Sequence, residues 1–530
     1  MVRVRAGLPE YAMMSAETRD QVDVLVVGGG INGAAIARDA AGRGLSVLLC
    51  EQDDLAAHTS SSSSKLIHGG LRYLEQYEFA LVGKALAERE VVLRSAPHIV
   101  RPLRFVLPHE PHLRPEWMIR AALLLYDNLG RRRAHTLIHS RRVDLGAHAA
   151  GAPLQPQFEK GFVYSDAWAD DARLVVLIAK DAAARGAQIA PRTRCTRVQR
   201  GPDIWLAHLC DEGGAERTIE ARALVNATGP WAASFLGEVA KMPKQRKLRL
   251  VKGSHIVVPR LYTHEYAYTF QQDDRRIVFA IPFERDFTLI GTTDVEFTGA
   301  PGAVHIDEAE THYLCAASNR YFSRAIAPRD VVWSYSGVRP LLDDEDSPAS
   351  EVTRDYVLDH DEDGAPLLSV FGGKITTHRK LAEEAVDWIA PVLGNESPAW
   401  TADGSTLPGG EFSRGDDISA GFDRFLHGVV RRYPWLPGGQ ALRYARAYGT
   451  RVDAILDGVN DLRDLGEPLG ADLYACEVDY LVREEWARTA DDILWRRSKL
   501  GLRFDASGRE RLEARLQIAR AKSAQDGMRA

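Results

Sequence analysis

Three glycines directly after an apolar, β-branched run carry the clearest chemical signal in this sequence. Gly28, Gly30 and Gly33 fill the three places of the pattern G-x-G-x-x-G. The first glycine permits a tight turn, the second leaves room for a pyrophosphate, and the third lets a helix pack closely on the strand. A second apolar run, Ser46–Cys50, ends in Glu51, and an acid about 20 residues after the glycines is placed to accept a hydrogen bond from a ribose hydroxyl. The stretch predicts a strand–turn–helix–strand site for a dinucleotide, with its phosphates at the helix N-terminus.

A serine-rich run lies where such a dinucleotide would be bound. Residues Thr59–Ser64 follow the predicted second strand closely, and composition alone would favour a flexible linker there. We expect its hydroxyl groups and backbone to wrap the pyrophosphate instead, since Arg72 and Tyr73 just beyond are unusual for a linker. Further along, His255 precedes the apolar run Ile256–Val258; a lone histidine is more often a hydrogen-bonded core residue than a catalyst.

The rest of the chain predicts the elements that position these residues. Segment 188–198 is expected to form a strand, 206–220 a hairpin and 223–229 a buried strand. Alternating Val, Ile, Tyr and Thr residues over 250–294 predict an antiparallel sheet. Beyond residue 395, charged segments with helical periodicity predict a helical domain. Because no second G-x-G-x-x-G pattern follows 223–229, a separate nicotinamide domain is not expected.

Composition and charge argue against a nucleic-acid-binding protein, a disulfide-rich protein and a membrane-spanning protein. The chain has 530 residues, enough for several domains, and its formal net charge of -6 gives no general attraction to nucleic acid or to an anionic membrane. The five cysteines are scattered and none forms C-x-x-C, which argues against a disulfide framework, a zinc site or an iron–sulfur cluster and for a reducing compartment. Residues 1–21 lack a signal-peptide pattern, and no stretch reaches the roughly 18 apolar residues of a membrane-spanning helix.

The run Thr59–Leu74 and several later stretches resemble one family, the FAD-dependent glycerol-3-phosphate dehydrogenases of the aerobic, quinone-linked type. The later stretches are Phe162–Asp166, Asp170–Leu174, Asn226–Trp231, Lys252–His255, Gly291–Asp294, Tyr335–Pro340 and Phe371–Lys374. Together with the glycine pattern, the resemblance implies an α/β fold: a Rossmann-like FAD-binding domain with an antiparallel-sheet substrate domain, as in D-amino-acid oxidase and glutathione reductase, and a C-terminal all-α domain.

We expect these domains to occupy defined ranges. An N-terminal extension covers 1–21. The FAD-binding domain is discontinuous, the substrate domain is inserted into it, and the helical domain follows. The predicted ranges are 22–95 with 155–245 and 335–395 for the FAD-binding domain, 96–154 with 246–334 for the substrate domain, and 396–530 for the helical domain.

The resemblance also implies the residues of the site. Arginines suit a substrate phosphate, because a guanidinium offers it two parallel charged hydrogen bonds. The implied substrate-binding residues are Arg72, Tyr73, Arg339, Arg354 and Lys374. The implied catalytic residues are His255, Arg339 and Lys374. The implied cofactor-binding residues are Gly28, Gly30, Ile31, Asn32, Gly33, Glu51, Thr59, Ser60, Ser64, Lys65, Leu66, Val198, Ala227, Gly229, Gly373, Lys374 and Ile375.

Two of these positions have a chemical reason of their own. A neutral imidazole at His255 suits proton removal near neutral pH, although the residues alone leave the general base open among His255, Lys374 and a bound water. The glycine turn before Lys374 is expected to aim amide hydrogens at the flavin's pyrimidine edge, where negative charge builds on reduction.

The activity that the resemblance implies is oxidation of sn-glycerol 3-phosphate to dihydroxyacetone phosphate by hydride transfer to FAD. Electrons would then pass to ubiquinone or menaquinone. The alternatives are a related FAD-dependent oxidase of a hydroxy or amino acid that uses oxygen, and a non-catalytic flavin-binding assembly protein.

The implied location is cytoplasmic, with peripheral attachment to the inner face of the cell membrane, and the implied assembly is a homodimer. Segment 117–126, with Trp117 at one end and Arg131–Arg133 just beyond the other, is too short to span a bilayer. From the residues alone a buried helix and an interfacial helix are equally good interpretations. The resemblance favours membrane contact through this segment, including Leu123 and Leu124.

Overall fold

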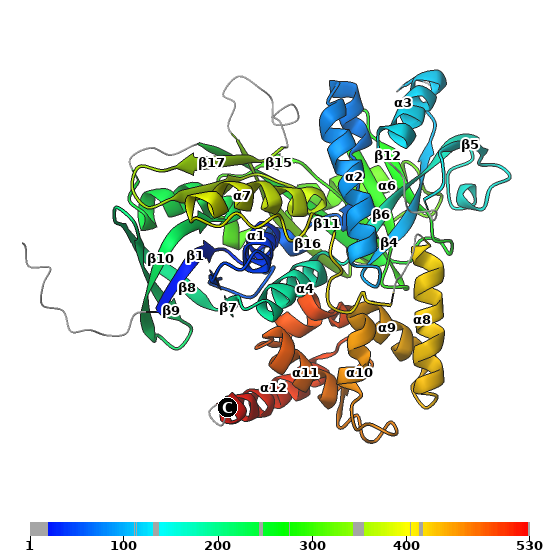
Figure 1. The fold of residues 1–530 in the computed structure, drawn as a ribbon. Helices are drawn as coiled ribbons and strands as arrows, with labels where there is room; N and C mark the ends of the chain where they lie inside the picture. Colours follow the sequence, from blue (N-terminus) through cyan, green and yellow to red (C-terminus); the bar gives the residue numbers. More distant parts are fainter. Residues whose placement is uncertain are drawn as a thin grey trace, which may run out of the picture.

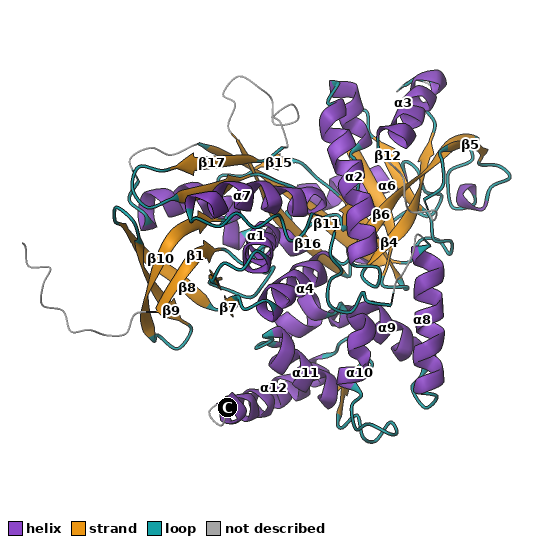
Figure 2. Cartoon of the chain, in the orientation of Figure 1, coloured by secondary structure: helices purple, strands orange, loops and turns teal. Residues whose placement is uncertain are grey.

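The computed structural model describes residues 20–110, 112, 114–130, 137–242, 247–274, 276–342, 355–402, 404–412 and 417–527. Two β-sheets lie side by side, and the C-terminal helices pack beneath them (Figure 1). Figure 2 shows the same view by secondary structure, with helices covering the sheets.

The first sheet has eight strands and is parallel at its centre. β1 (Asp20–Val27) pairs in parallel with β2 on one side and β10 on the other, so its apolar residues are buried on both faces. The remaining strands of this sheet are β2 (Val47–Cys50), β7 (Gln188–Ala190), β8 (Thr193–Arg200), β9 (Trp205–Asp211), β10 (Glu216–Asn226), β17 (Val357–Asp361) and β18 (Leu367–Phe371).

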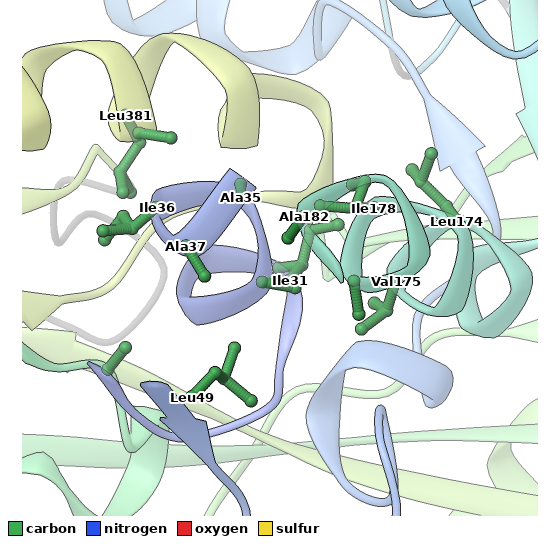
Figure 3. Close-up of a cluster of buried hydrophobic side chains, with 14 of the residues drawn as sticks. Ile31, Ala35, Ile36, Ala37, Leu49, Leu174, Val175, Ile178, Ala182 and Leu381 are labelled. Atoms are coloured by element: carbon green, nitrogen blue, oxygen red, sulfur yellow. The ribbon is translucent and has the colours of Figure 1, made fainter. Parts of the chain in front are cut away.

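One helix fills the space beside this sheet. α1 (Ile31–Gly42) packs between α4 (Asp171–Ala184) and α7 (His378–Val392). Its alanines are buried, and Figure 3 shows α1 beside both neighbours, with Ile36 facing Leu381 of α7. The N-terminus of α1 is thereby fixed next to the end of β1.

The second sheet has ten strands and is antiparallel except where β4 pairs with β12. Its strands are β3 (Leu66–Ile67), β4 (Val100–Pro108), β5 (Arg141–Asp144), β6 (Lys160–Ala169), β11 (Leu248–Pro259), β12 (Ala267–Gln271), β13 (Ile277–Phe283), β14 (Phe287–Gly291), β15 (Val295–Glu296) and β16 (Trp333–Leu342). The accompanying helices are α2 (Phe79–Ser95), α3 (Glu116–Leu129) and α6 (Glu308–Asn319).

The C-terminal part forms its own hydrophobic core. It contains α8 (Ile418–Arg432), α9 (Gly438–Tyr448), α10 (Val452–Ile455), α11 (Ala475–Glu485), the π-helical turn η10 (Asp492–Arg497), α12 (Ala506–Gly527) and a short hairpin of β19 (Pro468–Gly470) and β20 (Leu473–Tyr474). It docks on the first unit through a buried ion pair between Arg173 on α4 and Glu485, the last residue of α11.

The predicted fold class is confirmed: a Rossmann-like unit, a largely antiparallel unit and a C-terminal helical unit are present. The residue ranges stay a prediction. β3, β6 and part of β16 fall within ranges assigned to the FAD-binding domain, yet they pair in the second sheet. Local sequence does not reveal which sheet a strand joins when the chain crosses between two sheets repeatedly. β1 also starts at Asp20, inside the predicted extension.

Candidate active site

A cavity of about 960 Å³ opens where the parallel strands of the first sheet end. Val27, Cys50 and Ala227, at or just past the carboxyl ends of β1, β2 and β10, all line it. In parallel α/β sheets this edge is the usual place for a nucleotide, and the volume falls within the range of cofactor pockets, roughly 300–1,000 Å³.

The glycine turn presses its backbone against this cavity. Gly28 has φ +115, and a Cβ atom there would collide with the carbonyl oxygen of Ala227. A Cβ atom at Gly33 would collide with the carbonyl oxygen of Gly28, so the helix can approach the turn only with glycine here. The amide of Ile31, at the start of α1, donates to Ser60 Oγ at 3.0 Å. The serine-rich loop and the helix N-terminus therefore line the same cavity.

Glu51 lies beside the glycine turn, as the pattern predicts. Its carboxylate accepts hydrogen bonds from the amides of Gly29 at 2.6 Å and Asp53 at 2.9 Å. Burial raises the pKa of Glu51, against the two backbone donors, which lower it. The carboxylate is thus held in one orientation at the end of β2.

The side chain of Asn32 offers a hydrogen-bond acceptor to a polar ligand in the cavity. Its side-chain nitrogen donates to the carbonyl oxygen of Gly372 at 3.2 Å, while its Oδ1 is buried and has no hydrogen-bond partner among the described residues. Gly372 and Gly373 both have positive φ, +74 and +93, and this lets the turn after β18 close over the start of α1. The residues present fit a bound dinucleotide such as FAD.

The second half of the site is one face of the strand pair β11–β16. His255 lies opposite Tyr335 in the register, and Gly253 lies opposite Gly337. Arg339 follows two residues later on β16, so all of these positions share one face. The serine-rich loop lies against this face, where Thr59 Oγ1 donates to the carbonyl oxygen of Val338 at 2.8 Å.

His255 is buried and held on two sides. Its Nε2 lies 2.9 Å from Ser64 Oγ, and its ring stacks on Tyr335 with the ring centroids 4.8 Å apart. Burial, and then the positive charges of Arg339 and Lys65, hold the pKa of His255 well below its ordinary value. Nδ1 has no hydrogen-bond partner within the described part of the chain. A neutral imidazole with one unpaired ring nitrogen can accept a proton.

Two cationic side chains of the predicted site, Arg339 and Lys374, are each held by a neighbouring side chain. Arg339 forms an ion pair with Asp294 through Nη1, and its Nη2 lies 3.0 Å from Thr292 Oγ1. A Cβ atom at Gly253 would collide with this guanidinium. Lys374 lies over the ring of Tyr73, 4.0 Å from its centroid.

The opposite face of the same strands is a support. Glu310 on α6 accepts hydrogen bonds from Ser254 Oγ at 2.9 Å and Thr293 Oγ1 at 2.6 Å. It also forms an ion pair with Lys252 at 2.7 Å. Ser254 Oγ lies 2.8 Å from Ser336 Oγ, so β11, β16 and the segment after β14 are tied together behind the site.

Lys65 anchors the serine-rich loop. Its ammonium is fully buried, pairs with Asp171 on α4 at 2.8 Å and donates to the carbonyl oxygen of Ser61 at 3.0 Å. Ser63 Oγ donates to the same carboxylate at 2.8 Å. The side chain of Lys65 therefore points into the protein, so any contact it makes with a cofactor would come from its backbone.

The predicted cofactor residues divide into two groups. Those that line the cavity are Gly28, Gly30, Ile31, Asn32, Glu51, Thr59, Ser60, Ala227, Gly229 and Gly373. Those that lie outside its lining are Gly33, Ser64, Lys65, Leu66, Val198, Lys374 and Ile375. Val198 is buried in the core beneath β8. Arg72 and Tyr73 are half-buried on the short helix η2 (Leu71–Gln76), and Arg354 lies outside the described residues.

Sequence reasoning missed several residues of the cavity wall. The cavity is also lined by Arg192 in the turn before β8, by Thr193–Cys195 at the start of β8, and by Thr489, Asp491 and Arg496 of the C-terminal unit. None of these carries a local motif; only the folded chain brings them to the dinucleotide end.

Family models match almost the whole chain. Residues 23–379 match the model described as FAD dependent oxidoreductase. The chain belongs to the FAD-dependent oxidoreductase family. Residues 402–527 of this flavoprotein match the model described as the C-terminal domain of alpha-glycerophosphate oxidase, so the helical unit also has a counterpart within the family.

Similar proteins place the chain among the glycerol-3-phosphate dehydrogenases of this family. A protein of Pseudomonas aeruginosa named glycerol-3-phosphate dehydrogenase is 55% identical over 505 residues, covering 95% of this chain and 96% of its own. The aerobic glycerol-3-phosphate dehydrogenase of Escherichia coli is 50% identical, covering 92% of this chain and 96% of its own. The crystal structure of a Bacillus halodurans glycerol-3-phosphate dehydrogenase complexed with FAD has a TM-score of 0.75 at 28% identity, covering 95% of this chain and 91% of its own.

Another relative carries a different substrate in its name. A Brucella abortus protein named D-erythritol 1-phosphate dehydrogenase is 49% identical, covering 90% of this chain and 94% of its own. Both names describe the dehydrogenation of a polyol phosphate.

The buried imidazole predicts a pH effect on stability. His255 stays neutral in the folded protein but takes up a proton in the unfolded chain below its ordinary pKa of 6.5. It therefore lowers the unfolding free energy as pH falls below 6.5, by up to about 1.4 kcal/mol per pH unit. His255→Asn is expected to reduce this acid-side slope and to leave the slope above pH 6.5 unchanged, as measured by Tm against pH.

The control is His312→Asn, which makes the same substitution at an exposed histidine of α6 in place of a buried one. Parallel Tm curves for wild type and His255→Asn below pH 6.5 would show that His255 takes up its proton in the folded state.

Proposed function

We propose that the protein oxidises sn-glycerol 3-phosphate to dihydroxyacetone phosphate with FAD as its bound oxidant. The observation that carries this proposal is the near full-length identity to proteins named glycerol-3-phosphate dehydrogenase. The face of β11–β16 that carries His255 and Arg339 supports it, since the loop that lines the cavity packs against this strand pair through Thr59.

The reaction removes a hydride from the substrate's middle carbon and a proton from the hydroxyl group on that carbon. When bound, FAD supplies the redox chemistry as the hydride acceptor. We assign the proton to Nδ1 of His255, which requires the tautomer that donates from Nε2 to Ser64 Oγ. Stacking on Tyr335 fixes the plane of the imidazole ring and so positions the proton acceptor. The carbonyl would form as the hydroxyl group loses its proton to this acceptor and the carbon loses its hydride.

The phosphate is held by the cations at the edge of this face. In the proposal, Arg339, Arg72 and Lys374 form the clamp. Asp294 and Thr292 keep the fork of Arg339 oriented, and the planar guanidinium fork matches the geometry of a phosphate. Amides of the turn at Gly373 and Lys374 are proposed to face the flavin's pyrimidine edge.

A respiratory quinone as the final electron acceptor and a homodimeric assembly belong to the same proposal. They rest on the family resemblance.

Peripheral attachment to the inner face of the cell membrane is supported by one exposed surface. Among the described residues, no helix is both long and apolar enough to cross a bilayer. Large apolar side chains are nevertheless exposed on α3 and just before and at the start of α2. These residues, here called the apolar edge, are Tyr77, Phe79, Trp117, Met118, Leu124 and Leu125. Leu123 was expected to join this contact, but it is fully buried and cannot do so; Arg131–Arg133 lie outside the described residues.

Anaerobic reduction tests the proposed activity. Glycerol 3-phosphate is expected to bleach the visible flavin bands of the purified protein, whereas glycerol at the same concentration should not, because it lacks the phosphate. D-erythritol 1-phosphate is the comparison substrate. More efficient bleaching by the erythritol phosphate would move the assignment to that substrate, and a flavin that no polyol phosphate bleaches would overturn it. Peroxide formation that quinone does not suppress would favour an oxidase.

Removing the proposed phosphate partner should affect substrate binding more than turnover. Arg339→Met is expected to raise KM for glycerol 3-phosphate by about tenfold or more, since one charged partner of the phosphate is lost. Arg249→Met is the control, because Arg249 lies on β11 and pairs with the exposed Glu296. A steady-state KM that is the same in Arg339→Met and wild type would remove Arg339 from the clamp.

The apolar edge predicts membrane binding without a spanning segment. Leu124→Glu together with Leu125→Glu should reduce co-sedimentation with vesicles of phosphatidylethanolamine and phosphatidylglycerol, because burying a carboxylate in the interface is costly. Ile518→Glu, at an exposed position on α12, is the matched control. Equal co-sedimentation of the folded double variant and wild type would exclude α3 as the contact.

A further inference from the structure

The C-terminal unit reaches into the dinucleotide cavity. Thr489, Asp491 and Arg496 line it together with the loop after β2 and the turn between β7 and β8. Because Glu51 at the end of β2 marks the ribose side of such a site, these residues lie at its adenosine end. All three lie in or directly before η10.

The loop after β2 is tied to η10 by a buried carboxylate. Asp54 lies three residues beyond Glu51 and is almost fully buried. Arg497 binds it with two nitrogens, Nη1 at 2.5 Å and Nη2 at 2.8 Å, and Arg496 Nε lies 2.5 Å from the same carboxylate. Such a bidentate pair fixes the loop's position as well as stabilising it.

The turn between β7 and β8 is tied to the same segment. Asp492 is fully buried and accepts from Arg192 Nη2 at 2.8 Å and from Thr489 Oγ1 at 2.7 Å. Arg496 also pairs with Asp492. Arg496 therefore connects the two loops that line the cavity. It binds Asp54 in the loop after β2, and it pairs with Asp492, which also binds Arg192 in the turn between β7 and β8.

We propose that the C-terminal unit completes the FAD site: η10 holds the two loops that receive the adenosine diphosphate half of the cofactor, and Arg496 is the positioning residue. Loops held in place before binding lose less conformational freedom when the ligand arrives. Cofactor binding and docking of the C-terminal unit are then thermodynamically linked. This inference rests on the proposal that the cavity binds FAD.

The test measures ligand affinity of the full-length apoprotein by fluorescence titration with FAD, ADP and FMN. Arg496→Gln is expected to weaken FAD and ADP by a similar factor of about ten or more, since a buried charge pair is broken. FMN, which lacks the adenosine half, should bind as it does to wild type. Arg496→Lys should recover part of the loss.

Arg515→Gln is the matched control, since Arg515 pairs with Asp479 within the C-terminal unit and away from the cavity. Asp54→Asn provides a second route to the same contact, and its effect should not add fully to that of Arg496→Gln. If Arg496→Gln is folded by circular dichroism and binds FAD and ADP like wild type, the inference is wrong. Equal weakening of FAD and FMN would also overturn it, because the whole site would then have changed. A wild-type apoprotein that binds no FAD would instead overturn the proposed cofactor.

Discussion

One buried ion pair, between Lys65 and Asp171, holds the loop on which both halves of the site depend. Both groups are fully buried, so removal of either partner would leave an uncompensated charge, at a cost of about 3–5 kcal/mol. The loop that this pair anchors reaches the cavity through Ser60 and touches His255 through Ser64. The cofactor side and the substrate side of the site are therefore positioned by the same few residues.

The parts of the fold that could be predicted are those where local chemistry decides the conformation. Gly28, Gly33 and Glu51 could be placed from spacing alone, because the turn tolerates no Cβ atom and the acid follows the next strand. The C-terminal unit could also be located, because helical periodicity is a property of the local sequence. The serine-rich run was harder, since its composition is typical of a linker and only its position next to the predicted strand indicated a binding loop.

Features that depend on distant partners could not be predicted. The side chain of Lys65 faces Asp171, which lies 106 positions away in the sequence. No local pattern therefore shows that the lysine forms a buried structural ion pair. Leu123 and Leu124 are equally apolar in sequence, yet one is buried and the other exposed, because only tertiary packing decides which face of α3 is covered. Arg496 approaches the cavity from 442 positions beyond Asp54. The roles proposed for His255 and Arg339 came from resemblance, and the structure places the two residues on a shared face that their separation in sequence hides.

Along the strand pair β11–β16, successive residues point to opposite faces, so two sets of residues alternate. Gly253, His255, Tyr335 and Arg339 lie on one face, while Lys252, Ser254 and Ser336 bind the support around Glu310 or one another on the other. Substitutions at alternate positions can therefore change the face of His255 and Arg339 without loosening the framework behind it. Two relatives that are 55% and 49% identical to this chain are named for different polyol phosphates, and a two-sided strand pair of this kind would permit such a difference.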